Sequence, residues 1–94
     1  MHGEYKMPGG KLVVADLEVR AGKLAQVQIS GDFFLEPDTA LAVIDAALEG
    51  LRADVGKQQY TAAIQHALDQ NVQMYGVSPE AVAMAVQRAL ETSR

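Results

Sequence analysis

The sequence predicts an α+β domain, in which a three-stranded antiparallel β-meander is packed on one face by about three helices. Two observations support this prediction. In the first third of the chain, apolar and polar residues alternate with a period of two, and glycine-bearing turns separate the alternating segments. In the remaining two thirds, apolar residues recur every three or four positions, which is typical of amphipathic helices. Strands that precede helices along the chain favour a sheet with the helices gathered on one side.

The strand region contains three segments joined by short turns. A short mixed segment from Gly3 to Met7 ends at Pro8-Gly9-Gly10, a combination typical of tight turns. The next segment, from Lys11 to Arg20, places four apolar residues on one face: Val13, Ala15, Leu17 and Val19. After a hairpin turn at Gly22, a third segment repeats the alternation from Leu24 to Ser30, with Ala25, Val27 and Ile29 on its apolar face. We therefore expect a meander with one apolar face and one face open to water.

The helical region contains three amphipathic segments. Pro37 suits the first position of a helix whose apolar stripe consists of Leu41, Ile44, Leu48 and Leu51. A second helix is expected from about Lys57 to Asp69, with an inward stripe of Tyr60, Ile64, Ala67 and Leu68. A connection with extended character follows from Asn71 to Gly76. Ser78 is then the expected N-cap of a third helix, from about Pro79 to Glu91, that buries Val82, Ala85, Val86 and Ala89.

Composition narrows the class of protein. The 94 residues, 49% hydrophobic and 21% charged, fit one small globular domain over residues 1–94. The net charge of −4 and the scattered lysines and arginines argue against nucleic-acid binding, which needs clustered cations. Cysteine is absent, which excludes disulfides, thiolate metal sites and thiol catalysis. No stretch has the pattern of a signal peptide or a membrane span, so we expect a cytoplasmic protein.

The segment Gly31-Asp32-Phe33-Phe34 is the most informative part of the sequence. It holds both phenylalanines of the chain, side by side, between the third strand and the first helix. Successive residues of a strand point to opposite faces, so one ring can enter the core while the other points elsewhere, toward a partner protein. The alternative is that the loop turns here and both rings belong to the core. Asp32 has no second titratable group beside it in the pattern, so a turn or cap role is expected rather than catalysis.

Other motifs have structural interpretations. Pro8-Gly9-Gly10-Lys11 is similar in composition to a phosphate-binding loop, which has Ser or Thr after its lysine and leads into a helix. Here Leu12 follows the lysine and the next residues have a strand pattern, so a hairpin is expected. Lys11 remains a candidate contact for an anion carried by a partner. His2 and His66 lack a ligand at metal-binding spacing, so no metal site is expected. The sequence thus predicts no catalytic residue.

The turn and strand motifs together resemble the accessory domain of lipoate–protein ligases. The resemblance rests on Lys6-x-Pro8-Gly9-Gly10-Lys11, the hairpin at Gly22, the strand ending in Ile29-Ser30-Gly31-Asp32-Phe33-Phe34, and the helix ending in Leu48-Glu49-Gly50. It continues through the second helix, the connection to Gly76 and the helix after Val77-Ser78-Pro79. In these segments the pattern of residue types is similar more than the individual residues are. Nearly the whole chain is covered.

The resemblance implies a fold and a role. The fold would be the three-stranded, helix-covered SufE/NifU-like architecture. In such ligases a catalytic domain uses ATP to convert lipoate to lipoyl-adenylate and then transfers the lipoyl group to a lysine of a carrier domain. The accessory domain supports adenylation and carries no catalytic residue. Because the chain begins at Met1 and holds one domain, the separate-subunit form is expected, as part of a heterodimer. ATP, Mg²⁺ and lipoate would then bind to the catalytic partner, and lipoyl carrier domains would be indirect partners.

The expected partner-binding residues lie in a turn and at a sheet edge: Gly31, Asp32, Phe33 and Phe34 in the turn, and Pro8, Gly9, Gly10 and Lys11 at the edge. Three other functions compete with a ligase role. One is a stand-alone protein- or peptide-binding module of the same fold, which would recruit a strand at a sheet edge. Another is a self-associating structural protein. The third, an iron–sulfur scaffold or sulfur-transfer protein, is disfavoured because the chain has no cysteine.

Overall fold

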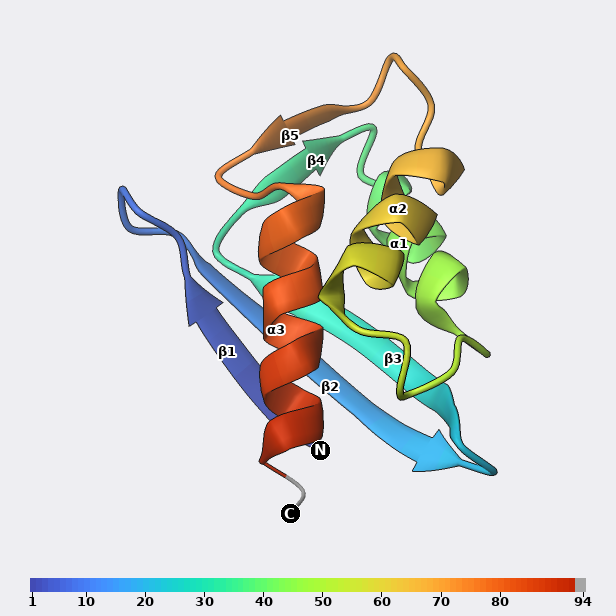
Figure 1. The fold of residues 1–94 in the computed structure, drawn as a ribbon. Coiled ribbons are helices and arrows are strands. Elements are labelled where there is room, and N and C mark those ends of the chain that lie inside the picture. Colours follow the sequence, from blue (N-terminus) through green and yellow to red (C-terminus); the bar gives the residue numbers. More distant parts are fainter. Residues whose placement is uncertain (93–94) are drawn as a thin grey trace.

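The computed structural model describes residues 1–92 and confirms the α+β class (Figure 1). Its elements, in chain order, are β1 (His2–Lys6), β2 (Leu12–Arg20), β3 (Lys23–Gly31), β4 (Phe34–Glu36), α1 (Ala40–Leu48), α2 (Lys57–Ala67), β5 (Gln73–Tyr75) and α3 (Pro79–Glu91). The first three strands form the predicted antiparallel meander in the order β1-β2-β3. A second, two-stranded sheet of β4 and β5 was not predicted. No helix of the described residues is long and apolar enough to cross a membrane.

The two long strands, β2 and β3, form the predicted apolar face. In β3 the alternation of buried and exposed residues is interrupted once. Val13, Ala15 and Leu17 of β2 are buried as expected. In β3 the buried residues are Leu24, Val27 and Ile29, so the expected inward position of Ala25 is wrong. The cause is a β-bulge, because two residues of β3, between Ala25 and Gln28, lie opposite the single Leu17. Gln26 takes a positive φ of 51° there, and the extra residue reverses the alternation.

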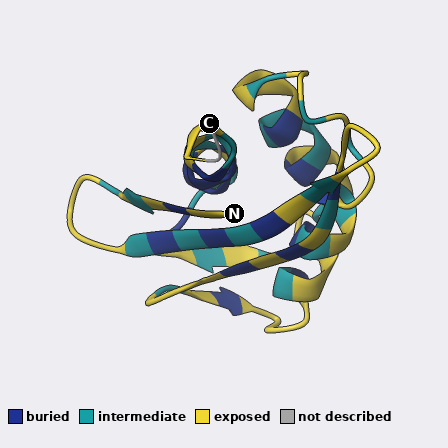
Figure 2. Cartoon of the chain, turned by 90° about the horizontal axis from the view of Figure 1, so that it is seen from below, coloured by how far each residue is buried: buried dark blue, intermediate teal, exposed yellow. Residues whose placement is uncertain are grey.

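Helix α3 covers the sheet at close range. It contacts β1 and β2, and its buried side faces the strands (Figures 1 and 2). That side is built mostly from alanine and valine: Ala81, Val82, Ala83, Ala85, Val86 and Ala89. Gly3 of β1 lies directly beneath the helix, and a Cβ there would overlap the backbone nitrogen of Ala89 and the carbonyl oxygen of Ala85. Small residues on both elements therefore allow backbone-to-backbone contact at this point.

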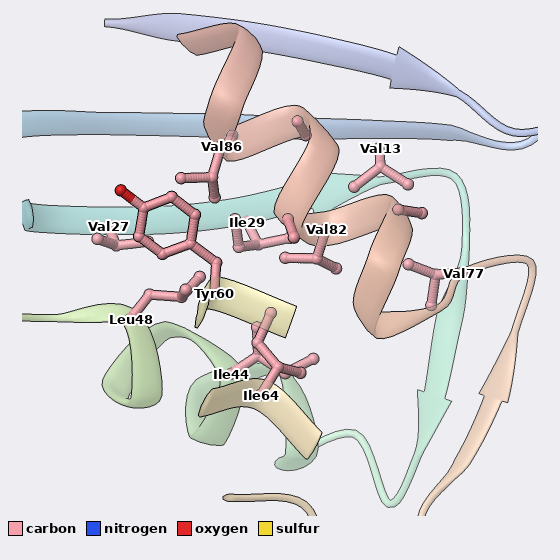
Figure 3. Close-up of a cluster of buried hydrophobic side chains, with 14 of the residues drawn as sticks. Val13, Val27, Ile29, Ile44, Leu48, Tyr60, Ile64, Val77, Val82 and Val86 are labelled. Atoms are coloured by element: carbon pink, nitrogen blue, oxygen red, sulfur yellow. The ribbon is translucent and has the colours of Figure 1, made fainter. Parts of the chain in front are cut away.

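The hydrophobic core lies between this helix, the sheet and the other two helices (Figure 3). Ile44 and Leu48 of α1 and Tyr60 and Ile64 of α2 are fully buried in it. The Tyr60 hydroxyl donates a hydrogen bond to the carbonyl oxygen of Arg52, 3.0 Å away, so the largest core side chain keeps its polar atom satisfied.

Helix boundaries differ from the sequence expectation in two places. Helix α1 begins at Ala40 and not at Pro37, because the residues after β4 first make a turn in which the Ala40 N–H donates to the Pro37 carbonyl. Helix α2 ends at Ala67, which is exposed, so its expected inward position is wrong. Helix α3 has the predicted bounds, and the Ser78 hydroxyl accepts a hydrogen bond from the Ala81 N–H at 3.1 Å, as expected of an N-cap.

The outer edge of β3 is closed by side chains of α1. The Asp45 carboxylate accepts a hydrogen bond from the Ile29 N–H at 3.0 Å, and the Glu49 carboxylate accepts one from the Val27 N–H at 2.6 Å. Farther along the edge, the Leu24 N–H donates to the Leu51 carbonyl and the Gly50 N–H donates to the Leu24 carbonyl. An incoming strand therefore finds three N–H groups and one carbonyl of this edge already occupied.

The close approach of α3 to β1 gives a first prediction. Gly3→Ala should lower the free energy of unfolding by about 2–3 kcal/mol, because the added methyl group meets backbone atoms that cannot rotate away. Chemical denaturation followed by circular dichroism measures this loss. Lys6→Ala, on an exposed position of the same strand, is the matched control and should change stability by less than about 0.5 kcal/mol. Equal effects of the two substitutions would contradict the proposed contact.

The edge cover of β3 gives a second prediction. Asp45→Ala should destabilise the protein by about 1–2 kcal/mol because the Ile29 N–H loses its acceptor. Asp45→Asn retains a carbonyl oxygen and should preserve most of the stability at neutral pH. The exposed edge of the alanine variant should also promote self-association, which light scattering at rising protein concentration would detect. An alanine variant as stable and as monodisperse as the asparagine variant would rule out the edge-capping role.

The third prediction concerns the pH dependence of stability at the same carboxylate. Burial raises the pKa of Asp45 above its ordinary value, and this outweighs the hydrogen bond from Ile29, which lowers it. A carboxyl group whose pKa is higher in the folded state favours folding when protonated. Its contribution is therefore lost as the pH rises from about 3.9, the unfolded value, through the raised folded pKa. The stability of Asp45→Asn relative to the wild type should accordingly increase from pH 3 to pH 7, and a constant difference would contradict the raised pKa.

Candidate partner-binding site

The two segments expected to bind a partner lie side by side. Gly31, at the end of β3, pairs with Val13 of β2. Beyond it, the Asp32 N–H donates to the Leu12 carbonyl at 3.3 Å, and the Asp32 carboxylate accepts from the Leu12 N–H at 2.7 Å. Asp32 therefore has a structural role, but this role is a link to the first residues of β2 rather than the predicted turn or cap.

Pro8, Gly9, Gly10 and Lys11 form the predicted hairpin between β1 and β2. The Gly10 N–H donates to the Met7 carbonyl at 2.9 Å, and the Met7 N–H donates to the Lys11 carbonyl at 2.8 Å. Gly9 and Gly10 have φ angles of 96° and 109°, which explains why glycine occupies both positions. The hairpin is exposed, and it opens onto a strand rather than a helix.

The two phenylalanine rings have different environments, which agrees with the interpretation that one ring points away from the core. Phe33 is half-buried against the core, and its ring lies over Gly31, where a Cβ would come within 2.7 Å of the ring. Phe34 is 58% exposed. The alternative, with both rings in the core, is therefore wrong, because β4 begins at Phe34 and turns this ring to the outer face of the second sheet.

Tyr75 is a residue of this site that the sequence analysis did not identify. It lies opposite Phe34 in the β4–β5 ribbon, and the two rings stack with centroids 4.6 Å apart and an interplanar angle of 18°. Tyr75 is 41% exposed, and its hydroxyl donates to the side-chain oxygen of Gln73 at 3.2 Å. The neighbouring pair, Leu35 and Met74, faces the core. Sequence reasoning recognised the extended character of residues 71–76 but had no local signal for their pairing with β4.

The hairpin and the ribbon also touch. A Cβ on Gly76 would lie 2.6 Å from Cγ of Lys11, so the aliphatic part of this lysine packs against the backbone next to Tyr75. Glycine and its φ of 80° thus permit the contact. We call this part of the surface the aromatic end face; it consists of Pro8, Gly9, Gly10, Lys11, Gly31, Asp32, Phe33, Phe34 and Tyr75.

Some cations of the described residues form ion pairs and others do not. Arg20 and Arg52 form ion pairs with Glu18 and Asp54, at 2.7 and 2.8 Å. Within residues 1–92, Lys6 and Lys11 form no ion pair, although they lie almost opposite each other on the β1–β2 hairpin. A negatively charged protein therefore carries one positive charge without an ion-pair partner, that of Lys11, next to its exposed aromatic pair.

The groups with shifted pKa values lie outside this face. Hydrogen bonds to the carboxylates of Glu4 and then Asp16, each 2.7 Å from a ring nitrogen, raise the pKa of His2. Burial raises the pKa of Asp45 at the β3 edge and that of Tyr60 in the core. These groups belong to separate parts of the fold and do not converge on one cavity. Among the described residues, no cluster of three or more His, Cys, Asp or Glu side chains could hold a metal ion.

Two shallow cavities border the loop between α1 and α2. The larger has a volume of about 540 Å³ and is lined by Gly50, Leu51, Arg52, Val55, Gln59, Ala62, Ala63 and His66. The other has a volume of about 320 Å³ and is lined by Ala21, Gly22, Lys23, Arg52, Ala53 and Asp54. Neither includes a residue of the aromatic end face. The charged group that borders both, the Arg52 guanidinium, is already paired with Asp54.

Comparison with known proteins gives one informative match. No protein-family model matches the chain, and no curated protein sequence matches it significantly. Among solved structures, the chain is similar to a component of an archaeal lipoylation system from Thermoplasma acidophilum, described as a bipartite lipoate protein ligase and its E2 lipoyl domain. The TM-score is 0.69 and the sequence identity 25%, over 92% of this chain and 97% of that chain. The resemblance predicted from the sequence is therefore confirmed: this chain is related in structure to a component of a bipartite lipoate protein ligase system.

Proposed function

We propose that this chain is the non-catalytic accessory subunit of a bipartite lipoate–protein ligase, in which it supports ATP-dependent adenylation of lipoate by a separate catalytic subunit. The main support is the structural match, which spans nearly the whole of one component of such a system and most of this chain. ATP, Mg²⁺ and lipoate bind to the catalytic subunit in this proposal, and lipoyl carrier domains meet the assembly through that subunit.

The roles of the polar side chains support a non-catalytic chain. The carboxylates of Asp32, Asp45 and Glu49 each accept a hydrogen bond from a backbone N–H. The hydroxyls of Tyr60 and Ser78 make structural hydrogen bonds in the core and at a helix terminus. Groups that hold the fold together in this way are not free to transfer protons or to attack a substrate.

A subunit of this kind acts by changing the state of its partner. Adenylation requires ATP, the metal ion and lipoate to be held in line, with the developing charge neutralised. A docked subunit accelerates this step when it binds the adenylating conformation of the catalytic chain more tightly than other conformations. A tenfold rise in the population of that conformation requires a difference of about 1.4 kcal/mol between the two binding free energies.

Closure of the β3 edge argues against the stand-alone peptide-binding alternative at that position. Strand addition needs free backbone groups, and at this edge the N–H groups of Leu24, Val27 and Ile29 and the carbonyl of Leu24 are already bonded to α1 and to the segment after it. We propose that the residues of the two predicted segments, Pro8–Lys11 and Gly31–Phe34, face the catalytic subunit instead.

The fourth prediction tests the accessory role directly. The catalytic lipoate–protein ligase chain of the same organism should form lipoyl-adenylate slowly alone, and at least about tenfold faster with an equimolar amount of this chain. Lipoate-dependent release of pyrophosphate from ATP measures the rate. This chain alone should release none. Transfer from pre-formed lipoyl-adenylate to a carrier domain should be unaffected, which separates help in adenylation from general stabilisation of the partner.

Two results would contradict this proposal. One is an adenylation rate that does not change when this chain is added in stoichiometric amount. The other is a lipoyl group on this chain itself after reaction, detected by mass spectrometry of both chains, because a lipoylated product would make the chain an acceptor rather than an accessory subunit.

A further inference from the structure

The stacked rings of Phe34 and Tyr75 form an exposed apolar feature that folding alone does not require. The five large apolar side chains that are exposed among the described residues are Met1, Phe34, Val43, Val55 and Tyr75. Of these, the two aromatic side chains are the ones that stack on each other. The inward pair of the same ribbon, Leu35 and Met74, already anchors β4 and β5 to the core.

The stack is preorganised for contact. The register of the ribbon places Phe34 opposite Tyr75, and the tyrosine hydroxyl is held by Gln73. Rings fixed in this way lose little conformational freedom when a partner covers them, so most of the buried area contributes to affinity. Aromatic side chains in such positions are the usual anchors of protein–protein interfaces.

Charge indicates the chemistry of the partner. Lys11 packs its aliphatic part against Gly76, next to Tyr75, and forms no ion pair within the described chain. An acidic group of a partner would therefore find a cation without an ion-pair partner beside the aromatic rings. A second copy of this chain is a poorer fit, since two molecules of net charge −4 repel each other.

We infer that the Phe34–Tyr75 stack, with Lys11 beside it, is the anchor by which this chain docks onto the catalytic ligase subunit. The partner contributes an apolar side chain that covers the two rings and a carboxylate that pairs with Lys11. This inference rests on the proposed function and adds to it the contact residues and the chemistry of the surface they meet. Of the two phenylalanines in the predicted segment, it assigns the contact to Phe34, while Phe33 serves the fold.

The fifth prediction concerns affinity. Phe34→Ala and Tyr75→Ala should each raise the dissociation constant for the purified catalytic chain about 10- to 30-fold in calorimetric titration. Tyr75→Phe keeps the stack and should bind within about twofold of the wild type. Lys11→Glu should weaken binding and also reduce its dependence on salt concentration, because the attraction that salt screens has been removed. Thermal unfolding of each variant should show a folded protein at the temperature of the titration, since loss of the stack costs only about 0.5–1.5 kcal/mol of folding free energy.

Matched substitutions far from the aromatic end face provide the control. Val55→Ala removes another exposed apolar side chain and Lys57→Glu reverses the charge of another lysine; both should leave affinity within about twofold. If these variants weaken binding as much as Phe34→Ala and Lys11→Glu do, the assigned surface is wrong. It is also wrong if the wild type forms a dimer in sedimentation and Phe34→Ala abolishes that dimer.

Failure of the inference and failure of the proposed function give different results. If the wild-type chain binds the catalytic subunit and accelerates adenylation while every variant of the aromatic end face behaves in the same way, the docking surface is wrong and the accessory role stands. If the wild-type chain neither binds nor accelerates, both are wrong.

Discussion

The contact between α3 and β1 at Gly3 is the constraint on which the rest of the structure depends. Backbone atoms of Ala85 and Ala89 occupy the space that a side chain at residue 3 would need. This proximity lets a helix made largely of alanine and valine bury a whole side against the sheet, although the chain has few large side chains. Arg88 strengthens the same junction, with its guanidinium over the Tyr5 ring and a hydrogen bond to the Glu4 carbonyl at 3.1 Å. A small chain thereby obtains a close-packed core at a point where both elements carry small residues.

The sheet leaves little of its edge open to other proteins. On the β3 side, α1 supplies two carboxylates to the strand backbone, and the residues after α1 complete the cover. On the β1 side, Thr92 and Arg88 donate hydrogen bonds to the His2 and Glu4 carbonyls. The open face of the sheet carries polar residues that pair with one another, such as His2 with Glu4 and Asp16. The aromatic end face differs from all three, because the rings of Phe34 and Tyr75 are exposed and stacked on each other.

Much of this arrangement could be predicted from the sequence, because local patterns determine it. The period-two alternation of β2, the glycine turns and the Ser78 N-cap each depend on residues close together in the chain, and the structure contains all of them. The two segments expected to bind a partner, Pro8–Lys11 and Gly31–Phe34, do lie side by side in the structure. The errors have non-local causes. The bulge at Gln26 depends on how β3 pairs with β2, and the inward position of Leu24 follows from that pairing. Tyr75 could not be predicted as a site residue because its role depends on stacking with Phe34. Phe34 is 41 positions away in the sequence but lies opposite Tyr75 in the ribbon.

Asp32 fixes the segment that carries the two phenylalanines to the sheet. Its carboxylate accepts a hydrogen bond from the Leu12 N–H, and its own N–H donates one to the Leu12 carbonyl. These two bonds fix the end of β3 to the start of β2. The next residue, Phe33, folds back over Gly31, and only then does the chain turn Phe34 outward into β4. The exposed ring is therefore held by a short and rigid path from the sheet. For a subunit without its own chemistry, such rigidity has a direct consequence. The subunit can shift the conformational equilibrium of its partner only by the difference between its binding free energies for the two conformations. An anchor that adapted equally well to both conformations would leave that equilibrium unchanged.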